Sequence, residues 1–233
     1  MAVSLAAVQR ALVGEVVMSE ELEKMADAIY DNQVPAAWAA KGFLSLKPLA
    51  SWIEDCNARI DFLRGWITKG TPAVYWISGL FFPQAFLTGT LQNYARQHTI
   101  AVDKLSYDFV LRDDINHADI TEKPASGCLS WGMYLEGCKW DYERHELAHS
   151  EPKKLFVDLP LLHLIPVPER AVPASGIYRC PVYKVLSRTG TLSTTGHSTN
   201  FVMWLELPAM STCIENEDLW IKAGVAAFLA LRY

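Results

Sequence analysis

The sequence predicts an α+β fold, a helical part followed by an antiparallel β part that forms a barrel or a sandwich. Up to Thr99 the apolar residues recur every three or four positions, which is the period of amphipathic helices. Beyond Thr99 they alternate with polar residues, which is the period of a half-buried strand. We therefore divide the chain into a helical subdomain, residues 1–102, and an antiparallel β-barrel-like subdomain, residues 103–233, with no Gly/Ser-rich linker between them.

Composition and charge exclude several classes of protein. The chain has 233 residues, 51% of them apolar and 20% charged, so it can bury a core. Net charge is only −5, and the 21 Lys and Arg are scattered, so we expect no nucleic-acid partner. The longest apolar runs, such as Val225 to Leu231, are far shorter than the ~20 residues of a bilayer span, so we expect no membrane partner. The five cysteines lack a CxxC pair, which predicts reduced thiols in a cytosolic compartment.

Four amphipathic helices are predicted in the first half. The first runs from Leu5 to Val16, and the second follows a cap at Ser19, with Glu20 and Glu21 in its first turn. Pro48 opens the third helix, whose stripe predicts a seam against another helix. The stripe consists of Leu49, Trp52, Ile53, Cys56, Ile60, Leu63 and Ile67. An extended apolar segment, residues 76–82, then meets Pro83, which suits the first position of the fourth helix.

Short alternating segments predict the strands of the second half. They are Leu105–Leu111, Leu129–Leu135, Leu161–Val167, Ile177–Leu186 and Phe201–Leu207. Residues Trp220 to Tyr233 fit a helix or a strand, and we favour a last strand at Val225–Leu231. Pro181 predicts an edge position for its strand, because proline donates no ladder hydrogen bond. Thr189-Gly190 predicts a tight hairpin that pairs this strand with residues 191–195, because glycine accepts a positive φ.

Four motifs resemble one family, and they occur in the order expected for it. The first combines FFPQAFLTG and LQNYAR, between Phe81 and Arg96. LEGCKWD, CPVYK and LSTTGHSTNFV follow at residues 135–141, 180–184 and 192–202. Together they resemble the C-terminal domain of dynein heavy chains, and the last motif resembles the axonemal, ciliary or flagellar branch. Cys138 departs from the family, in which a small residue is commoner, and so does the end LALRY.

The resemblance implies a fold, a function and a location. The fold would be a helical part followed by an incomplete antiparallel β-barrel. The protein would be a non-catalytic accessory domain that docks on the AAA+ motor ring of the same heavy chain and modulates ATP-driven motility. Its partners would be that ring and, indirectly, microtubules; its location would be the cytoplasm, in the axoneme. No cofactor and no catalytic, cofactor-binding or metal residue is expected.

The main alternative is a zinc-dependent hydrolase. His145-Glu146-Leu147-Ala148-His149 spells HExxH, which on a helix places two imidazoles on one face for zinc and a glutamate beside them as general base. Its flanks are strongly polar and Pro152 leaves little room for a helix, and a third ligand would have to be His163 or His197. We therefore expect the segment to face solvent without a metal.

Other arrangements of reactive residues are weaker. Residues 65–71 have the two glycines of a phosphate loop but lack the Lys-Ser/Thr pair that follows the second. Ser193, His197 and Asp218 could be combined as a triad, but there is no GxSxG elbow, and the stretch is typical of a hydroxyl-rich turn. A free-standing interaction module is a third possibility. Met1 enters a helix directly, which instead favours an excised piece of a longer protein.

Overall fold

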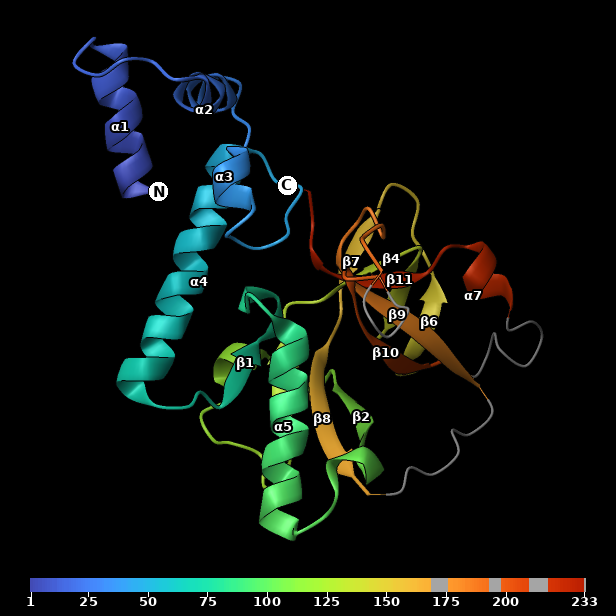
Figure 1. Ribbon diagram of the computed structural model, residues 1–233. Helices are drawn as coiled ribbons and strands as arrows, with labels where there is room; N and C mark the ends of the chain where they lie inside the picture. The colour runs from blue at the N-terminus through green and yellow to red at the C-terminus, as the bar shows by residue number, and fades with distance from the viewer. Residues whose placement is uncertain (169–175, 193–197, 210–217, 233) are drawn as a thin grey trace.

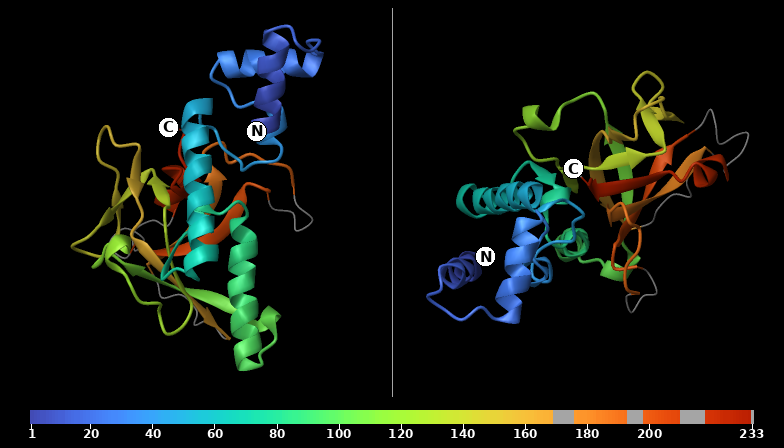
Figure 2. Two further views of the ribbon diagram at one scale, coloured as in Figure 1. Left: turned by 90° about the vertical axis from the view of Figure 1, so that its left-hand side faces the viewer. Right: turned by 90° about the horizontal axis from the view of Figure 1, so that it is seen from above.

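The computed structural model describes residues 1–168, 176–192, 198–209 and 218–232. Figure 1 shows its N-terminal helices apart from a body made of longer helices and sheets, and the two views of Figure 2 agree. The helices are α1 (Ala2–Leu12), α2 (Glu20–Tyr30), α3 (Ala36–Ala39), α4 (Leu49–Lys69), α5 (Pro83–His98) and α7 (Asp218–Lys222). None of these described helices is long and apolar enough to cross a bilayer.

The four predicted helices are confirmed as α1, α2, α4 and α5, although α1 ends at Leu12 rather than Val16. The Ser19 hydroxyl accepts a hydrogen bond of 3.3 Å from the backbone N–H of Leu22, so the predicted cap begins α2. Pro83 is the first residue of α5, where its fixed φ is already helical.

The strands lie in three sheets. Their bounds are β1 (Val74–Trp76), β2 (Ser106–Arg112), β3 (Cys128–Trp131), β4 (Tyr134–Glu136), β5 (Cys138–Asp141), β6 (Glu146–His149), β7 (Phe156–Asp158), β8 (Leu161–Val167), β9 (Ile177–Val185), β10 (Phe201–Pro208) and β11 (Ala226–Ala230). Short 3-10 helices are η1 (Ile77–Gly79), η2 (Val102–Lys104) and η3 (His117–Asp119). One sheet has the order β1-β3-β8-β2, the second has the order β10-β9-β11-β4-β7, and β5 and β6 form the third.

The α+β class is confirmed, but the incomplete antiparallel barrel is not. Across the described residues the strands form three separate sheets and no closed barrel. Two of the pairings are parallel, β1 with β3 and β9 with β11. Helix α5 lies along the four-stranded sheet (Figure 1), and the Tyr107 hydroxyl donates a 2.6 Å hydrogen bond to the Leu87 carbonyl.

The predicted strand Leu129–Leu135 is two strands in two sheets. β3 belongs to the four-stranded sheet and β4 to the five-stranded one, and the backbone turns at Gly132, whose φ is +93°. A Cβ atom there would lie 2.5 Å from the Ser78 hydroxyl and 2.6 Å from the Trp76 ring. Glycine is therefore required twice, by the backbone conformation and by the close packing.

Two predictions about β9 are wrong. It lies between β10 and β11, so it is not an edge strand. Pro181 is tolerated because the ladder with β11 begins only at Val182, so the missing N–H faces no partner on that side. The expected hairpin at Thr189-Gly190 is also absent, because β9 pairs with β10, and Leu192 forms only an isolated bridge with Ser198. Residues 193–195 of the predicted strand lie outside the described residues.

The stripe predicted along α4 is buried only in its first half. Leu49, Trp52 and Cys56 are buried, whereas Ile60 and Ile67 are 42% and 84% exposed. The next buried residue on the same face of α4 is Arg59, which is only 3% exposed. Its guanidinium carbon lies 3.9 Å from the centre of the Phe43 ring, a favourable cation–π contact.

Arg59 joins α4 to the segment that precedes α5. Its guanidinium pairs with Asp55 at 3.1 Å and donates a hydrogen bond of 3.3 Å to the Leu80 carbonyl. The segment 76–82 is not extended throughout, because β1 ends at Trp76 and η1 follows. Burial lowers the pKa of Arg59, and the Asp55 carboxylate offsets part of that effect, so the arginine stays charged.

We predict that Arg59→Ala strongly destabilises the domain. The substitution leaves the Asp55 side chain, 9% exposed, without its closest cationic partner, and breaking a buried ion pair in this way costs about 3–5 kcal/mol. Arg64→Ala is the matched control in the same helix, because its pair with Asp61 is exposed and contributes at most about 1 kcal/mol. Chemical denaturation measures both, and equal losses in the two variants would contradict the buried-pair interpretation.

A second pair of substitutions should change stability in opposite directions. Gly132→Ala forces a methyl group against Ser78 and Trp76 at a positive φ, so we expect a loss of about 1–2 kcal/mol or more. Gly89→Ala lies within α5, where nothing is within 4 Å of the added methyl group, so a gain of about 0.5–1 kcal/mol is expected. Thermal unfolding of both variants shows whether each one loses or gains stability. A Gly132→Ala protein as stable as the unmutated one would show that the passage from β3 to β4 does not need glycine.

Candidate docking surface

The HExxH motif lies on a β-hairpin rather than on a helix. Glu146 begins β6, which pairs with β5, and His145 stands in the turn with a φ of +55°. Four residues of extended backbone span about 13 Å, whereas two zinc–nitrogen bonds reach only about 2.1 Å each. His145 and His149 therefore cannot ligate one ion in this conformation. Both are exposed as predicted, but the prediction is wrong for Glu146 and Leu147, which are buried.

His145 has a structural partner. One of its ring nitrogens, Nδ1, lies 2.7 Å from a carboxylate oxygen of Asp113, and the Trp140 indole N–H donates to the same oxygen at 2.8 Å. These contacts fix the β5–β6 hairpin to the loop after β2. His163 instead lies 2.8 Å from the Ser126 carbonyl through Nε2. Within the described part of the sequence, no three His, Cys, Asp or Glu residues are grouped as metal ligands.

The two glycines of the suggested phosphate loop do not form a site, and most of the suggested triad lies outside the described residues. Residues 65–69 continue α4 to its last residue, and only Gly70 leaves the helix, so the two glycines do not enclose a phosphate loop. Of the suggested triad, Ser193 and His197 lie outside the described residues, and Asp218 begins α7.

Buried cysteines do not supply a nucleophile. Burial raises the pKa of the Cys128 thiol to about 11 and that of Cys138 to about 12, and it raises the pKa of Cys180 as well. The reactive species of cysteine is the thiolate, so these three remain protonated and unreactive near neutral pH. Cys56, Cys128, Cys138 and Cys180 are all free thiols, as expected for a reducing compartment.

An exposed apolar surface on α1 and α2 is the most distinctive candidate for a functional site. Helix α2 has no buried residue, although it is amphipathic. The most exposed apolar side chains of α1, α2 and the segment between them, which we call the N-terminal apolar surface, are Val3, Leu12, Val13, Val17 and Tyr30. Val3, Val17 and Tyr30 are 85%, 87% and 90% exposed. All five lie within residues 1–30, and exposed apolar groups gathered in one region mark binding surfaces more often than scattered ones do.

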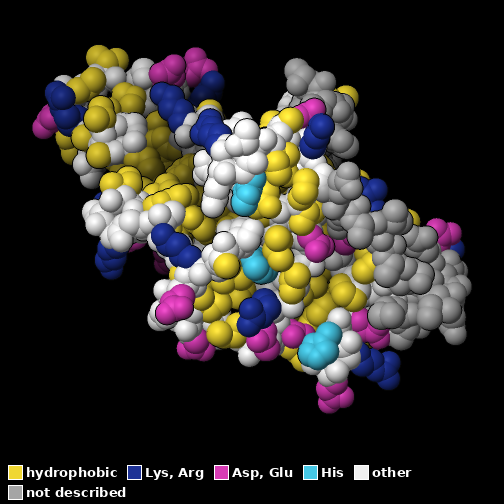
Figure 3. All heavy atoms as spheres, turned by 90° about the horizontal axis from the view of Figure 1, so that it is seen from below, with side chains coloured by type: hydrophobic (Ala, Val, Ile, Leu, Met, Phe, Trp, Pro, Cys, Tyr) yellow, Lys and Arg dark blue, Asp and Glu magenta, His cyan; other side chains and the backbone are white. Residues whose placement is uncertain are grey.

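We call residues 1–30, which include α1 and α2, the N-terminal lobe. Figure 3 shows hydrophobic side chains on this lobe, at the upper left of that view, with charged side chains among them. The lobe contacts the body through few groups. The Trp38 indole donates a hydrogen bond of 2.9 Å to the Ser4 hydroxyl, and Met25 and Ile29 of α2 pack against a small core around Trp38 and Trp52. The remaining apolar side chains of the lobe are free to meet another surface.

Sequence comparison identifies the family. Residues 1–229 match the family model of the C-terminal domain of the dynein heavy chain. The protein belongs to this family. Three similar curated proteins are dynein axonemal heavy chains 1 and 3 of Homo sapiens and heavy chain 12 of Rattus norvegicus. Their identities are 50%, 43% and 43% over 96%, 95% and 96% of the 233 residues. The resemblance inferred from the four motifs is thus confirmed, including its axonemal character.

The dynein C-terminal domain is a small share of these relatives. The matched region is 5% of heavy chains 1 and 3 and 7% of heavy chain 12.

Periodicity detected α1 and α2, but it could not show that their apolar faces stay uncovered. Only the exposed fractions of the side chains reveal the N-terminal apolar surface.

We predict that metal chelation leaves the melting temperature of the domain unchanged. His145→Ala with His149→Ala should lower the free energy of unfolding by less than about 1 kcal/mol, because the His145 ring is 67% exposed and the Asp113 carboxylate keeps its hydrogen bond from Trp140. Melting curves of both proteins, each with and without EDTA, measure this. A melting temperature that falls with EDTA in the unmutated domain alone would restore the zinc hypothesis.

Proposed function

We propose that this protein is a non-catalytic accessory domain of an axonemal dynein heavy chain. It docks on the AAA+ motor ring of the same heavy chain and modulates ATP-driven motility on microtubules, in the cytoplasmic axoneme of a cilium or flagellum. The observation that supports this most is the family match along residues 1–229, together with 50% identity to dynein axonemal heavy chain 1. The division into a helical and a β subdomain at residue 102 is part of the same proposal.

The N-terminal apolar surface is the docking face in this proposal. Burying one valine side chain contributes about 1.5–3 kcal/mol, so a few of them suffice to hold a domain against a neighbour within one polypeptide. A tether raises the effective concentration of the two surfaces, and weak contacts then act as stable ones.

Docking alters the motor through differential binding. A domain that contacts one ring conformation better than another shifts their populations, about tenfold for each 1.4 kcal/mol of difference. ATP hydrolysis belongs to the rest of the heavy chain in this proposal. The domain supplies a coupling free energy between nucleotide sites and track binding rather than a chemical step.

The N-terminal apolar surface gives a matched test in the complete motor. Val13→Asp with Val17→Asp places charges on the proposed docking face, and we expect docking to weaken about tenfold or more, because a charge buried in an apolar contact is costly. Ile67→Asp with Ile221→Asp is the control, because these isoleucines are similarly exposed but lie in α4 and α7. Single-molecule run length and force, measured beside steady-state ATPase, report the change.

Deletion of residues 1–233 from the heavy chain is the second half of the test. We expect run length, force or nucleotide-dependent release from the track to change while the ring stays folded. ATP hydrolysis by the isolated domain would refute the proposal. So would a deletion that leaves every mechanical and ATPase parameter unaltered.

A further inference from the structure

A cleft of about 840 Å³ lies on the β part of the domain, away from the N-terminal apolar surface. It opens between β4, β7 and the β5–β6 hairpin. Aromatic rings and charged groups share its walls, which include Tyr134, Trp140, Tyr142 and Phe156. The family motif LEGCKWD contributes Lys139, Trp140 and Asp141 to this cleft, whereas Tyr142 and Asp158 lie outside all four motifs.

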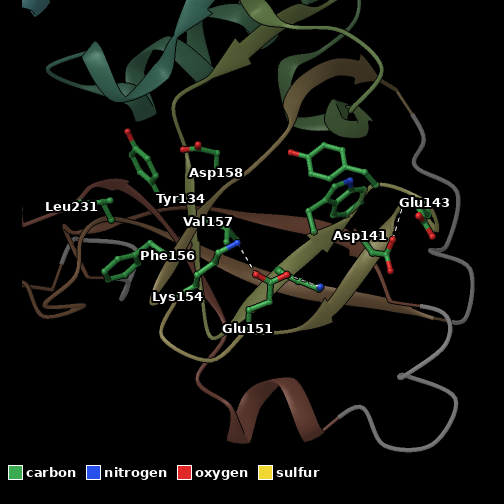
Figure 4. A pocket seen from close by; sticks show the side chains of 12 residues that line it. Tyr134, Asp141, Glu143, Glu151, Lys154, Phe156, Val157, Asp158 and Leu231 are labelled. Atoms are coloured by element: carbon green, nitrogen blue, oxygen red, sulfur yellow. Dashed lines mark hydrogen bonds and ion pairs between the residues drawn. The ribbon is translucent and has the colours of Figure 1, made fainter.

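The two lysines of the cleft share one carboxylate. Lys139 and Lys154 both pair with Glu151, at 3.0 Å and 2.6 Å, and Figure 4 shows the Lys154 ammonium directed at that carboxylate. The two side-chain hydrogen bonds from Lys154 and Lys139 lower the pKa of Glu151 to about 2. Both ammonium groups are held at Glu151 rather than at Asp158, and the cleft is lined by four carboxylates against two lysines.

Asp158 stands beside Tyr134 in the wall of the cleft, without a cationic partner among the described residues. Its cross-strand partner in the β4–β7 ladder is Tyr134, so the two side chains stand on the same face of the sheet, as Figure 4 shows. Burial raises the pKa of Tyr134 and of Tyr142, and the negative charge of Asp158 raises both further. Among the described residues no cationic side chain pairs with Asp158.

We propose that this cleft binds the guanidinium group of an arginine in an extended segment of a partner protein. A guanidinium can donate two parallel hydrogen bonds to a carboxylate while its flat face rests on an aromatic ring. Asp158 supplies the carboxylate, Tyr134 supplies a ring and a hydroxyl opposite it in the β4–β7 ladder, and Tyr142 is a further ring in the lining of the cleft. Asp141 and Glu143 at the rim add negative charge that attracts the cation. The partner segment is independent of the docking proposed for α1 and α2.

Arginine fits this cleft better than lysine. An ammonium group is a compact, strongly hydrated charge that cannot bind a carboxylate through two parallel bonds. A cation stabilised by a tyrosine ring gains about 0.5–2 kcal/mol, depending on how much water is removed. The binding site is therefore specific for a flat cation, not for positive charge in general.

The test uses the 233-residue protein and three short peptides. Acetyl-Gly-Arg-Gly-amide, the same peptide with lysine, and the same peptide with neutral citrulline are titrated into isotopically labelled protein and followed by NMR. We expect saturable shifts at the amides of Tyr134 and Asp158 and at the Trp140 indole. The arginine peptide should bind several-fold more tightly than the lysine peptide and at least tenfold more tightly than the citrulline peptide.

Two variants make the result decisive. Asp158→Asn removes the charge at an exposed position, so it should weaken the arginine peptide about tenfold without changing the melting temperature. Asp103→Asn, an exposed aspartate of η2 outside the cleft, is the control and should bind like the unmutated protein. Equal binding of arginine and citrulline peptides would overturn the proposal. Shifts scattered over the surface, or equal losses in the two variants, would also overturn it.

Discussion

The buried charge of Arg59 is the constraint on which the arrangement of this domain depends. A guanidinium with 3% exposure must be stacked and hydrogen-bonded on all sides, and its partners come from different segments. Asp55 lies one turn away on α4, Phe43 lies before α4, and the Leu80 carbonyl lies just before α5. Satisfying one side chain therefore fixes the approach of α4 to the segment that begins α5, and with it the placement of α5 on the four-stranded sheet.

The second constraint is the passage between the two larger sheets at Gly132. Period-2 alternation continues from Leu129 to Leu135, so the pattern alone predicts one strand. The left-handed conformation of Gly132 turns the backbone, and the close packing of Ser78 and Trp76 against it leaves room only for a hydrogen. Alternation records which side of a sheet a residue faces, but it does not record which sheet that is, so the division into β3 and β4 could not be predicted.

Local signals predicted the helices because caps and stripes act within a few residues. Ser19 and Pro83 mark the starts of α2 and α5 through their own backbone and side-chain chemistry. Contacts that depend on strand order were missed. Proline usually marks an edge strand, but Pro181 lies in a central strand because the pairing of β9 with β11 begins only at Val182. The HExxH motif, which is helical in zinc enzymes, lies on a β-hairpin here. The family was recognisable from short motifs, whereas the two candidate surfaces depend on exposure and on cross-strand register, which the sequence does not encode locally.

The N-terminal lobe and the body differ in how firmly they are held. The body is built around a large core with many fully buried side chains, whereas α2 buries none of its residues completely. Regions with few buried apolar contacts open at low free energy, so the lobe is the part of the domain whose conformation a neighbour can most easily change. Because Trp38 and its small core connect the lobe to α4, a surface that binds α1 and α2 acts on the body through α4. Arg59 then makes that connection rigid, since any displacement of α4 must break its contacts or carry the segment before α5 along with it.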